Sequence, residues 1–529
     1  MSSSPSAFGP RSAGLSGWRR IERAFDIAFE PALNPLRHLG SIGFLALWLL
    51  AASGVVLFIV FDTSVDGAWR SIERLSRVPL GLGDLLRGLH RYAADALLLV
   101  MLLHIVREWL HGHERGVRRF HWLTGVPLVV FFLVSAVGGF WLPWDQLSQY
   151  LATATAEWLD ALPMLATPLA RNFLTDHAVS DRLFSLFIFI HVGVPILFLF
   201  GLWFHIQRLA HATAIPPRPL VVGLLGVLAL LSLAWPVTSH APAALQQVPA
   251  FLRLDWLLLW PLPLVDATSP IFAWLVVGGA LLLLAALPFF PQPVRAAVAV
   301  VDADNCSGCP RCFEDCPYAA ITLVPHTNQR PGHLLAQVDP DLCIGCGICA
   351  GACPSSTPFR SMPQLVTGID MPQSPLDALR RDLRQGLSAT SGGQAPLVVF
   401  ACDHGACAEA VRQQPGVVTH QVLCAGQLPP SFVEYALREG AAGVLVAACP
   451  EGGCEFRLGE RWTAERLAGQ REPHLRAQVP AERLALVHAG PGDEGKLARA
   501  LTRLRLRVQG LSNPKKILTD EHVHETSRA

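Results

Sequence analysis

The sequence predicts a multidomain chain: a transmembrane α-helical bundle, a cysteine-rich metal-binding domain and an α/β domain with a parallel sheet. Hydrophobic residues make up 51% of the 529 residues and charged residues only 16%, which is more apolar than an ordinary soluble protein. The long uncharged runs stop near Pro291, and all thirteen cysteines lie at or after Cys306. Their two- and three-residue gaps indicate metal ligands in a reducing compartment, not disulfides.

Six apolar runs are each about long enough to cross a hydrocarbon core ~30 Å thick. They are Ser41–Phe61, Leu89–Val106, Trp122–Leu142, Leu183–Ile206, Leu220–Val237 and Ile271–Phe290. With the N-terminus inside the cell, arginine is more frequent in the cytoplasmic segments than in the opposite loops. This bias predicts a multi-pass protein of the cytoplasmic (inner) membrane, with its N-terminus and cysteine-rich domains in the cytoplasm. The amphipathic segment 1–40 shows no signal-peptide pattern.

Histidines recur at one interval in the second and fourth runs. His90 and His104 are fourteen residues apart, and so are His191 and His205. Fourteen residues is close to four helical turns, so each pair lies on one helix face, about 21 Å apart along the axis. Both helices run in the same direction, which pairs His90 with His191 and His104 with His205 as two bis-imidazole sites.

The first and third runs repeat this interval with glycine, at Gly40 and Gly54 and at Gly125 and Gly139. Glycine has no Cβ and lets a helix approach a flat macrocycle closely. A single intramembrane histidine is more often a hydrogen-bonded packing residue. The joint repeat favours two b-type haems, because polar groups in lipid are costly and need a reason.

Several stretches match those of a known family: Leu39-Gly40-Ser41, Arg87-Gly88-Leu89-His90, Leu103-His104-Ile105-Val106-Arg107, Gly139-Phe140-Trp141-Leu142-Pro143-Trp144-Asp145-Gln146-Leu147-Ser148, and His191 followed by Pro195. With them, residues 30–210 resemble the N-terminal half of the cytochrome b subunit of quinol-oxidising bc and b6f complexes. The resemblance implies that Arg87 and Arg107 pair with haem propionates. Snorkelling of these arginines to lipid headgroups is the alternative.

The fifth and sixth runs resemble the C-terminal half of that family only faintly. The family carries a Pro-Glu-Trp-Tyr signature at its outer quinol site, whereas this chain has Leu254-Asp255-Trp256-Leu257-Leu258. Asp255 either replaces the glutamate or is an interfacial anchor. His211 either lines a quinone pocket near the inner haem or is an ordinary loop histidine.

Eight cysteines form a doubled pattern, Cys306-x2-Cys309-x2-Cys312-x3-Cys316-Pro317 and then Cys343-x2-Cys346-x2-Cys349-x3-Cys353-Pro354. This is the spacing of bacterial two-cluster ferredoxins, in which the fourth cysteine of each run ligates the other cluster. We expect one [4Fe–4S] cluster on Cys306, Cys309, Cys312 and Cys353, and a second on Cys343, Cys346, Cys349 and Cys316. Zinc knuckles, the alternative, favour four-cysteine sets without a trailing Cys-Pro.

Apolar runs alternate with helical patterns beyond residue 396, which predicts βαβ units on a parallel sheet. Cys402, Cys424 and Cys449 each follow a predicted strand, and the carboxyl ends of such strands converge on one crevice. With Cys407 and Cys454 on the following turns, this placement favours a metal site, although each cysteine alone is more often a structural thiol.

The stretches Val422-Leu423-Cys424-Ala425-Gly426, Glu439-Gly440-Ala441-Ala442-Gly443-Val444-Leu445-Val446 and Ala448-Cys449-Pro450-Glu451-Gly452-Gly453-Cys454 resemble the delta subunit of methyl-viologen-reducing hydrogenase. That family holds a [2Fe–2S] cluster and passes electrons to heterodisulfide reductase. The resemblance implies that Cys402, Cys424, Cys449 and Cys454 are its ligands here, with Cys407 as the alternative.

These features predict seven segments: an amphipathic N-terminus (1–40), a di-haem four-helix domain (41–212), two further transmembrane helices (213–292), a 2[4Fe–4S] ferredoxin domain (293–360), a linker (361–395), an α/β iron–sulfur domain (396–511) and a disordered tail (512–529). The transmembrane bundle thus has about six helices around a four-helix di-haem core.

The expected function is that of an oxidoreductase subunit within a larger complex. It would pass electrons between a cytoplasmic heterodisulfide-reductase-, hydrogenase- or dehydrogenase-like enzyme and the membrane quinone pool. The alternatives are a bc-like quinol oxidase that drives reduction of a cytoplasmic acceptor, and a redox-sensing membrane scaffold. A net charge of +1 argues against nucleic acid as a partner, and a homodimer stays open. No catalytic residue is assigned.

Overall fold

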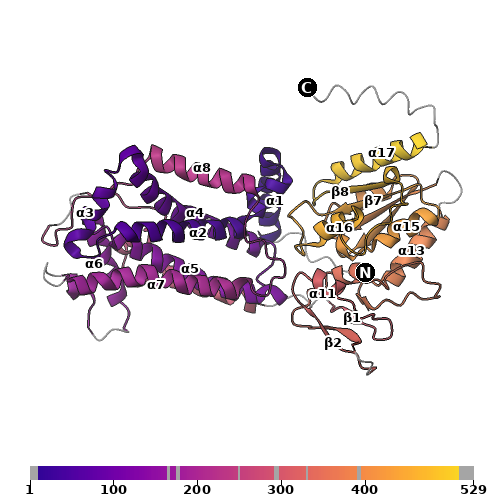
Figure 1. The fold of residues 1–529 in the computed structure, drawn as a ribbon, viewed down its shortest axis with the longest axis horizontal. Coiled ribbons are helices and arrows are strands. Elements are labelled where there is room, and N and C mark those ends of the chain that lie inside the picture. Colours follow the sequence, from indigo (N-terminus) through magenta and orange to yellow (C-terminus); the bar gives the residue numbers. More distant parts are fainter. Residues whose placement is uncertain are drawn as a thin grey trace. The chain divides into compact units, whose positions relative to one another are not determined.

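The computed structural model describes residues 10–163, 167–173, 179–247, 251–290, 297–328, 332–389 and 395–511. It divides into two compact units, Met1–Gln207 with Ala212–Pro293 and Arg208–His211 with Val294–Ala529 (Figure 1). The predicted tail 512–529 and residues 390–394 of the predicted linker lie outside the described residues.

The regular structure in the described part of the first unit consists of helices, which turns and loops connect. Its helices are α1 (Pro10–Phe29), α2 (Leu39–Val60), α3 (Val65–Leu75), α4 (Leu82–Leu110), α5 (Arg119–Trp141), α6 (Gln146–Asp160), α7 (Asp181–Ile206), α8 (Arg218–Ala234), α9 (Pro261–Ala267) and α10 (Pro270–Ala286). Short 3-10 turns join them: η1 (Pro31–Leu33), η2 (Pro35–Arg37), η3 (Pro79–Gly81), η4 (Gly116–Arg118), η5 (Ala170–Phe173) and η6 (Leu287–Phe289).

All six predicted membrane runs fall on helices of this unit. Within the described residues, four helical stretches are long and apolar enough to cross a membrane: Leu39–Val60, Gly116–Trp141, Asp181–Ile206 and Pro270–Phe289. The apolar helix α8 is shorter, with 17 residues. It ends at Ala234 instead of the expected Val237, because Pro236 disfavours the helical conformation of the residue before it.

Two helix pairs build the core of this unit, with α2 packed along α4 and α5 packed along α7. Buried aliphatic and aromatic side chains from all four helices meet in one apolar cluster that includes Ala46, Leu97, Leu128 and Phe198. Helix α8 packs on α4 where Gly88 faces Ser232, so closely that a Cβ at Gly88 would lie 2.5 Å from Ser232 Cβ. Glycine is therefore required at this helix crossing.

The second unit begins with two small antiparallel pairs of strands. Strand β1 (Val300–Val301) pairs with β4 (Ile369–Asp370), and β2 (Ile321–Pro325) pairs with β3 (Leu334–Val338). The short helices α11 (Arg311–Asp315) and α12 (Ile348–Ala352) lie between them in the chain and carry cysteines. This is the ferredoxin-type domain that the sequence predicts.

The remainder is a four-stranded parallel sheet of order β6-β5-β7-β8, as predicted. Its strands are β5 (Leu397–Cys402), β6 (Val417–Val422), β7 (Gly443–Ala448) and β8 (Leu484–His488). The helical elements are α13 (Leu376–Ala389), α14 (Glu409–Arg412), η7 (Ala425–Gln427), α15 (Pro430–Arg438), α16 (Gly459–Leu467), η8 (Ala481–Arg483) and α17 (Glu494–Leu511). Helices α13 and α15 pack on one face of the sheet and α17 on the other (Figure 1).

Helix α13 corrects the expectation of a linker at residues 361–395. Its charged helix was predicted, but Leu376, Leu383 and Leu387 are buried against Val398 and Phe400 of the sheet. Their spacing of seven and four residues forms an apolar stripe on one helix face, and burial of that stripe holds α13 on the sheet. The segment is thus part of the packed α/β domain.

Candidate functional site

The four spaced histidines lie on the two helices predicted to carry them, His90 and His104 on α4 and His191 and His205 on α7. The ring centroids of His90 and His191 are 6.1 Å apart, with 72° between the ring planes. His104 lies close enough to His205 for their charges to interact. The structure therefore brings the histidines together in the two pairs that the spacing predicts.

Hydrogen bonds hold the Nδ1 atom of three of these imidazoles. Ser53 Oγ lies 3.0 Å from His90 Nδ1, Ser135 O lies 2.8 Å from His191 Nδ1, and Thr124 Oγ1 lies 3.2 Å from His205 Nδ1. A partner at Nδ1 fixes the ring orientation and leaves Nε2 for a metal ion, as around metal-bound histidines generally. These partners were not predicted from the sequence, although Ser53 and Thr124 directly precede Gly54 and Gly125.

Three of the four spaced glycines press against these imidazoles. A Cβ at Gly139 would lie 2.7 Å from His191 Cε1, one at Gly54 would lie 3.1 Å from His90 Cε1, and one at Gly125 would lie 3.3 Å from His205 Cε1. Among the described residues, none has an atom within 4 Å of the Cβ position of Gly40. The glycine repeat thus gives room for the histidine rings themselves, besides its expected role of clearance for a macrocycle.

The two arginines expected near haem propionates have protein partners. Arg87 is buried and donates from Nη2 to Ser239 Oγ at 2.6 Å. Arg107 donates from Nη1 to Glu108 Oε1 at 3.0 Å. Burial of Arg87 speaks against the snorkelling alternative for that residue, because its side chain points into the protein.

Asp255 is held by a residue far away in the sequence. It forms an ion pair with Arg91, the residue after His90, and its Oδ1 accepts hydrogen bonds from the amides of Leu257 at 2.9 Å and Leu258 at 2.6 Å. Arg91 also pairs with Asp95 at 2.6 Å. This arrangement gives Asp255 a structural role: it holds the amides of the following turn and pairs with Arg91.

His211 lies in the second unit. Its Nε2 is 2.8 Å from the carbonyl oxygen of Glu314, and its ring meets Trp462 edge-on. These contacts agree with the alternative of a loop histidine.

The eight cysteines of the doubled pattern gather in two sets. Cys316, Cys343, Cys346 and Cys349 line one cavity of about 20 Å³. Cys312 lies beside Cys306, Cys309 and Cys353, and burial, followed by these neighbouring thiols, raises its pKa to about 12. Four soft sulfur donors in each set suit an iron–sulfur cubane. The crossed assignment, in which Cys316 and Cys353 exchange sites, agrees with this geometry.

Four cysteines of the C-terminal domain form a closed ring of thiols. Cys402 contacts Cys424 and Cys449, and both of these contact Cys454. The Sγ atoms of Cys402 and Cys449 are 3.6 Å apart. Hydrogen bonds from Cys424 and Cys449 lower the pKa of Cys402 and of Cys454. A compact ring of four buried or half-buried sulfurs fits a cluster with four thiolate ligands.

The surroundings of this thiol ring bear on which cysteines belong to it and on how it is covered. Cys407 is exposed and takes no part in it, which favours the first of the two ligand sets left open by the sequence. A Cβ at Gly459 would lie 2.0 Å from Cys424 Sγ, so glycine is required where α16 covers the ring. Glu460 is buried beside Cys454, its Oε2 has no hydrogen-bond partner, and burial raises its pKa well above the usual value.

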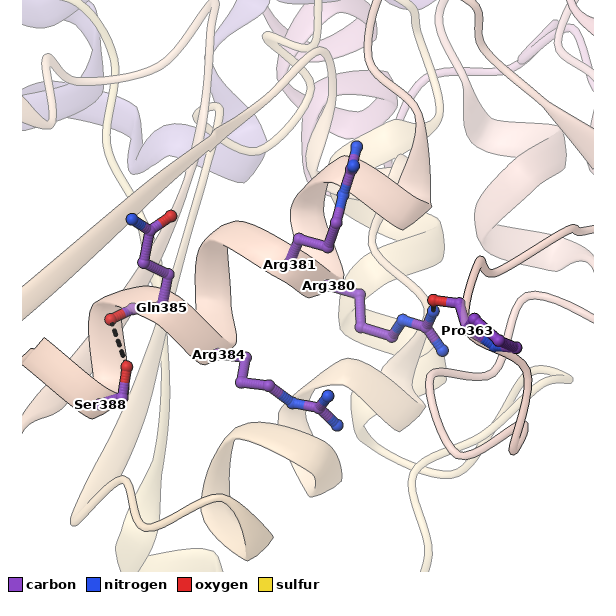
Figure 2. Close-up of a pocket in the computed structure, with 6 residues that line it drawn as sticks. All are labelled: Pro363, Arg380, Arg381, Arg384, Gln385 and Ser388. Carbon is purple, nitrogen blue, oxygen red and sulfur yellow. Dashed lines mark hydrogen bonds between the residues drawn. The ribbon is translucent and has the colours of Figure 1, made fainter.

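A separate pocket lies along α13 and is lined by Pro363, Arg380, Arg381, Arg384, Gln385 and Ser388 (Figure 2). Its volume is about 300 Å³. The guanidinium of Arg380 donates to the carbonyl oxygens of Met362 and Pro363, and Arg384 donates to the hydroxyl of Tyr435 at 2.7 Å. These arginines are therefore occupied by structural contacts, and no cysteine or histidine lines the pocket.

Comparison with known proteins identifies all three domain types in the predicted order. Residues 25–213 match the family cytochrome b/b6/petB, residues 305–357 match the 4Fe-4S dicluster domain, and residues 397–512 match the methyl-viologen-reducing hydrogenase, delta subunit. Each match agrees with a resemblance or motif found in the sequence. The first family implies haem b and the second implies an iron–sulfur cluster.

Two curated relatives each match about a third of the chain. Cytochrome b of Rickettsia typhi is 34% identical over 180 residues, which is 33% of this chain and 45% of that protein. Cytochrome b of Rickettsia prowazekii is 33% identical over the same length and with the same coverage. The chain thus spans less than half the length of the curated relatives it matches.

Among solved structures, a chain of a hyperthermophilic respiratory complex III is 21% identical, with a TM-score of 0.40, over 48% of this chain and 75% of that chain. The family matches give the chain a cytochrome b domain, a 4Fe–4S dicluster domain and a hydrogenase delta-subunit-like domain, in this order. Together with its helices that are long and apolar enough to cross a membrane, these domains are the content of a membrane electron-transfer subunit.

Proposed function

We propose that this protein is the membrane subunit of a larger redox complex and passes electrons between a cytoplasmic redox enzyme and the quinone pool. The observation that carries the proposal is the pairing of histidines on α4 and α7, with Nδ1 held by Ser53, Ser135 or Thr124. A packing histidine has no need of a free Nε2 inside a bundle, whereas a haem iron does.

In this proposal each haem is held by one histidine from α4 and one from α7. His90 and His191 hold the outer haem, and His104 and His205 hold the inner one. Arg87 exchanges Ser239 for a haem propionate, which is a stronger, charge-assisted acceptor than a serine hydroxyl. Arg107, which now donates to the Glu108 carboxylate, pairs with a propionate of the other haem. Gly40, Gly54, Gly125 and Gly139 leave room for the macrocycles and the ligand rings.

The cysteine sets supply the soluble part of the route. Two [4Fe–4S] clusters occupy the two sets of the ferredoxin-type domain, and a [2Fe–2S] cluster occupies Cys402, Cys424, Cys449 and Cys454. Clusters and haems each carry one electron at a time, and a quinone accepts two. The arginine bias supports a cytoplasmic location of the clusters, where a partner enzyme of the heterodisulfide-reductase, hydrogenase or dehydrogenase type supplies the substrate chemistry.

A bc-like outer quinol site built on Asp255 finds little support. A carboxylate that accepts a proton from quinol must be accessible to it. Asp255 instead pairs with Arg91 and accepts two backbone amide hydrogen bonds. Both of its carboxylate oxygens are therefore already held by protein donors.

The test is cofactor analysis and electron transfer in the purified full-length protein in lipid nanodiscs. We expect two haem b and about ten non-haem iron atoms per chain, from two [4Fe–4S] clusters and one [2Fe–2S] cluster. A quinol analogue should reduce the haems and then the clusters, and Cys346→Ser should stop the reduction beyond that cluster without affecting haem reduction. A reduced-minus-oxidised spectrum without a b-type band would refute the proposal.

A further inference from the structure

One buried arginine of the second unit touches segments that carry ligands of two different cysteine sets. Arg466, on α16, is 1% exposed. It forms an ion pair with Asp315, the residue before Cys316, and its Nη2 lies 3.5 Å from the carbonyl oxygen of Ile348, between Cys346 and Cys349. Its Nη1 donates to the carbonyl oxygen of Gly426 at 2.8 Å, two residues after Cys424.

The charges around Arg466 are arranged in a small group. Asp315 accepts a second guanidinium through its Oδ1, from Arg471 Nη1 at 2.6 Å, and its carbonyl oxygen accepts from Trp462 Nε1 at 3.2 Å. Two guanidiniums therefore share one buried carboxylate. Glu465, which pairs with Arg471 at 2.7 Å, is 21% exposed, so water screens its charge more than that of Arg466.

The two domains also meet through close backbone packing at this place. A Cβ at Gly351 would lie 2.1 Å from the carbonyl oxygen of Gly426, so α12 and η7 approach as closely as backbones can. One apolar cluster includes Cys346 and Ile348 of the ferredoxin-type domain together with Cys424, Cys454 and Trp462. Among the described residues of this cluster there is no cysteine of the Cys306 set.

We propose that Arg466 is a positioning residue that makes the centre on Cys316, Cys343, Cys346 and Cys349, and not the one on Cys306, Cys309, Cys312 and Cys353, the direct electron partner of the C-terminal centre. Its charge also raises the reduction potential of both adjacent centres. The inference rests on the proposed function, which fills these sets with clusters. The step is the transfer of one electron, so one centre is oxidised and the other reduced without any bond or proton change.

The physical basis is the placement of a cation in a dry interface. A cluster gains one negative charge on reduction, and a nearby guanidinium favours that charge most where water is excluded. Without the Arg466 guanidinium, Asp315 pairs with Arg471 only, and reduction of the two adjacent clusters becomes less favourable. The centre on Cys306 lies outside the apolar cluster around Arg466 and should respond less.

The experiment is an EPR-monitored redox titration of the full-length protein, with each signal assigned by Cys306→Ser and Cys346→Ser variants. Arg466→Met should lower the midpoint potentials of the two adjacent centres relative to the Cys306 centre and weaken the magnetic coupling between those two. Arg466→Lys keeps the charge but loses the forked hydrogen bonds, so it should retain the potentials and lose part of the coupling. Arg461→Met, on the same helix but 62% exposed at its side chain, is the matched control and should change neither.

Each result bears on one of the two ideas separately. Absence of iron–sulfur signals from the wild-type protein would overturn the proposed function. Normal signals with potentials and coupling unchanged in Arg466→Met would overturn the inference alone. Coupling of the C-terminal centre that survives Cys346→Ser and disappears in Cys306→Ser would also overturn it. If Arg466→Met fails to assemble its clusters, wild-type coupling in Arg466→Lys would still contradict the positioning role.

Discussion

A methyl group added at Gly139 is the sharpest test of the geometry around the histidine pairs. A Cβ at this position would lie 2.7 Å from His191 Cε1 and 3.1 Å from its Nδ1, closer than carbon atoms approach in folded proteins. The imidazole must therefore move away from α5 and break its contact with Ser135 O. Gly139→Ala should reduce occupancy of the haem that we assign to His90 and His191.

The expected change in the free energy of unfolding of Gly139→Ala is the sum of two opposing contributions. Overpacking of a close-packed interior costs about 1–3 kcal/mol, whereas alanine in place of glycine inside a helix stabilises by roughly 0.5–1 kcal/mol. Gly278→Ala on α10 is the matched control, because its Cβ meets no atom within 4 Å and only the second term applies. The control cancels the helix term, so Gly139→Ala should be less stable than Gly278→Ala by about 1–3 kcal/mol.

The assay combines a pyridine haemochrome measurement of haem per protein with thermal melting in detergent. The same measurements on Gly54→Ala and Gly125→Ala should give smaller losses, since their Cβ distances to the histidine rings are 3.1 and 3.3 Å. In Gly40→Ala the new Cβ meets no atom of the described residues within 4 Å, so a loss of haem there would report contact with the macrocycle itself. Equal haem content and melting in Gly139→Ala and Gly278→Ala would refute the packing argument.

Four further substitutions probe the other sites. His104→Leu should remove one of two haems, read as about half the b-type absorbance, because bis-imidazole ligation needs both rings. Cys402→Ser should abolish the [2Fe–2S] EPR signal while Cys407→Ser preserves it, since only the former belongs to the thiol ring. Asp255→Asn should destabilise the first unit in thermal melting without abolishing quinol turnover. The loss should be smaller than the about 3–5 kcal/mol of a fully buried ion pair, because the side chains of Arg91 and Asp255 are 21% and 19% exposed.

Each of these has a contrary outcome. Full absorbance in His104→Leu would end the assignment of the inner haem. Loss of the signal in Cys407→Ser would move that residue into the ligand set. Abolished quinol turnover in a stable Asp255→Asn protein would restore the outer quinol site.

Local patterns in the sequence were enough for most of the architecture. The fourteen-residue interval of His90 and His104 places both on one helix face whatever surrounds them, because helical periodicity is a property of the backbone. The short gaps between cysteines predict metal-binding loops, because closely spaced thiolates can reach the same cluster. The alternation beyond residue 396 predicts the parallel sheet that the structure contains. Membrane runs follow from composition and length alone.

Contacts between distant segments depend on the tertiary structure. Arg91 meets Asp255 164 residues away, and Arg466 meets Asp315 across 151 residues, and no short pattern records either pair. Ser135 O holds His191 only because α5 packs along α7. The sequence determined which residue types were present at helical and loop spacing. The packing of whole elements decided which Nδ1 atoms are held, which four of five cysteines form a ring and which carboxylates are paired, since these depend on the side chains that folding brings together.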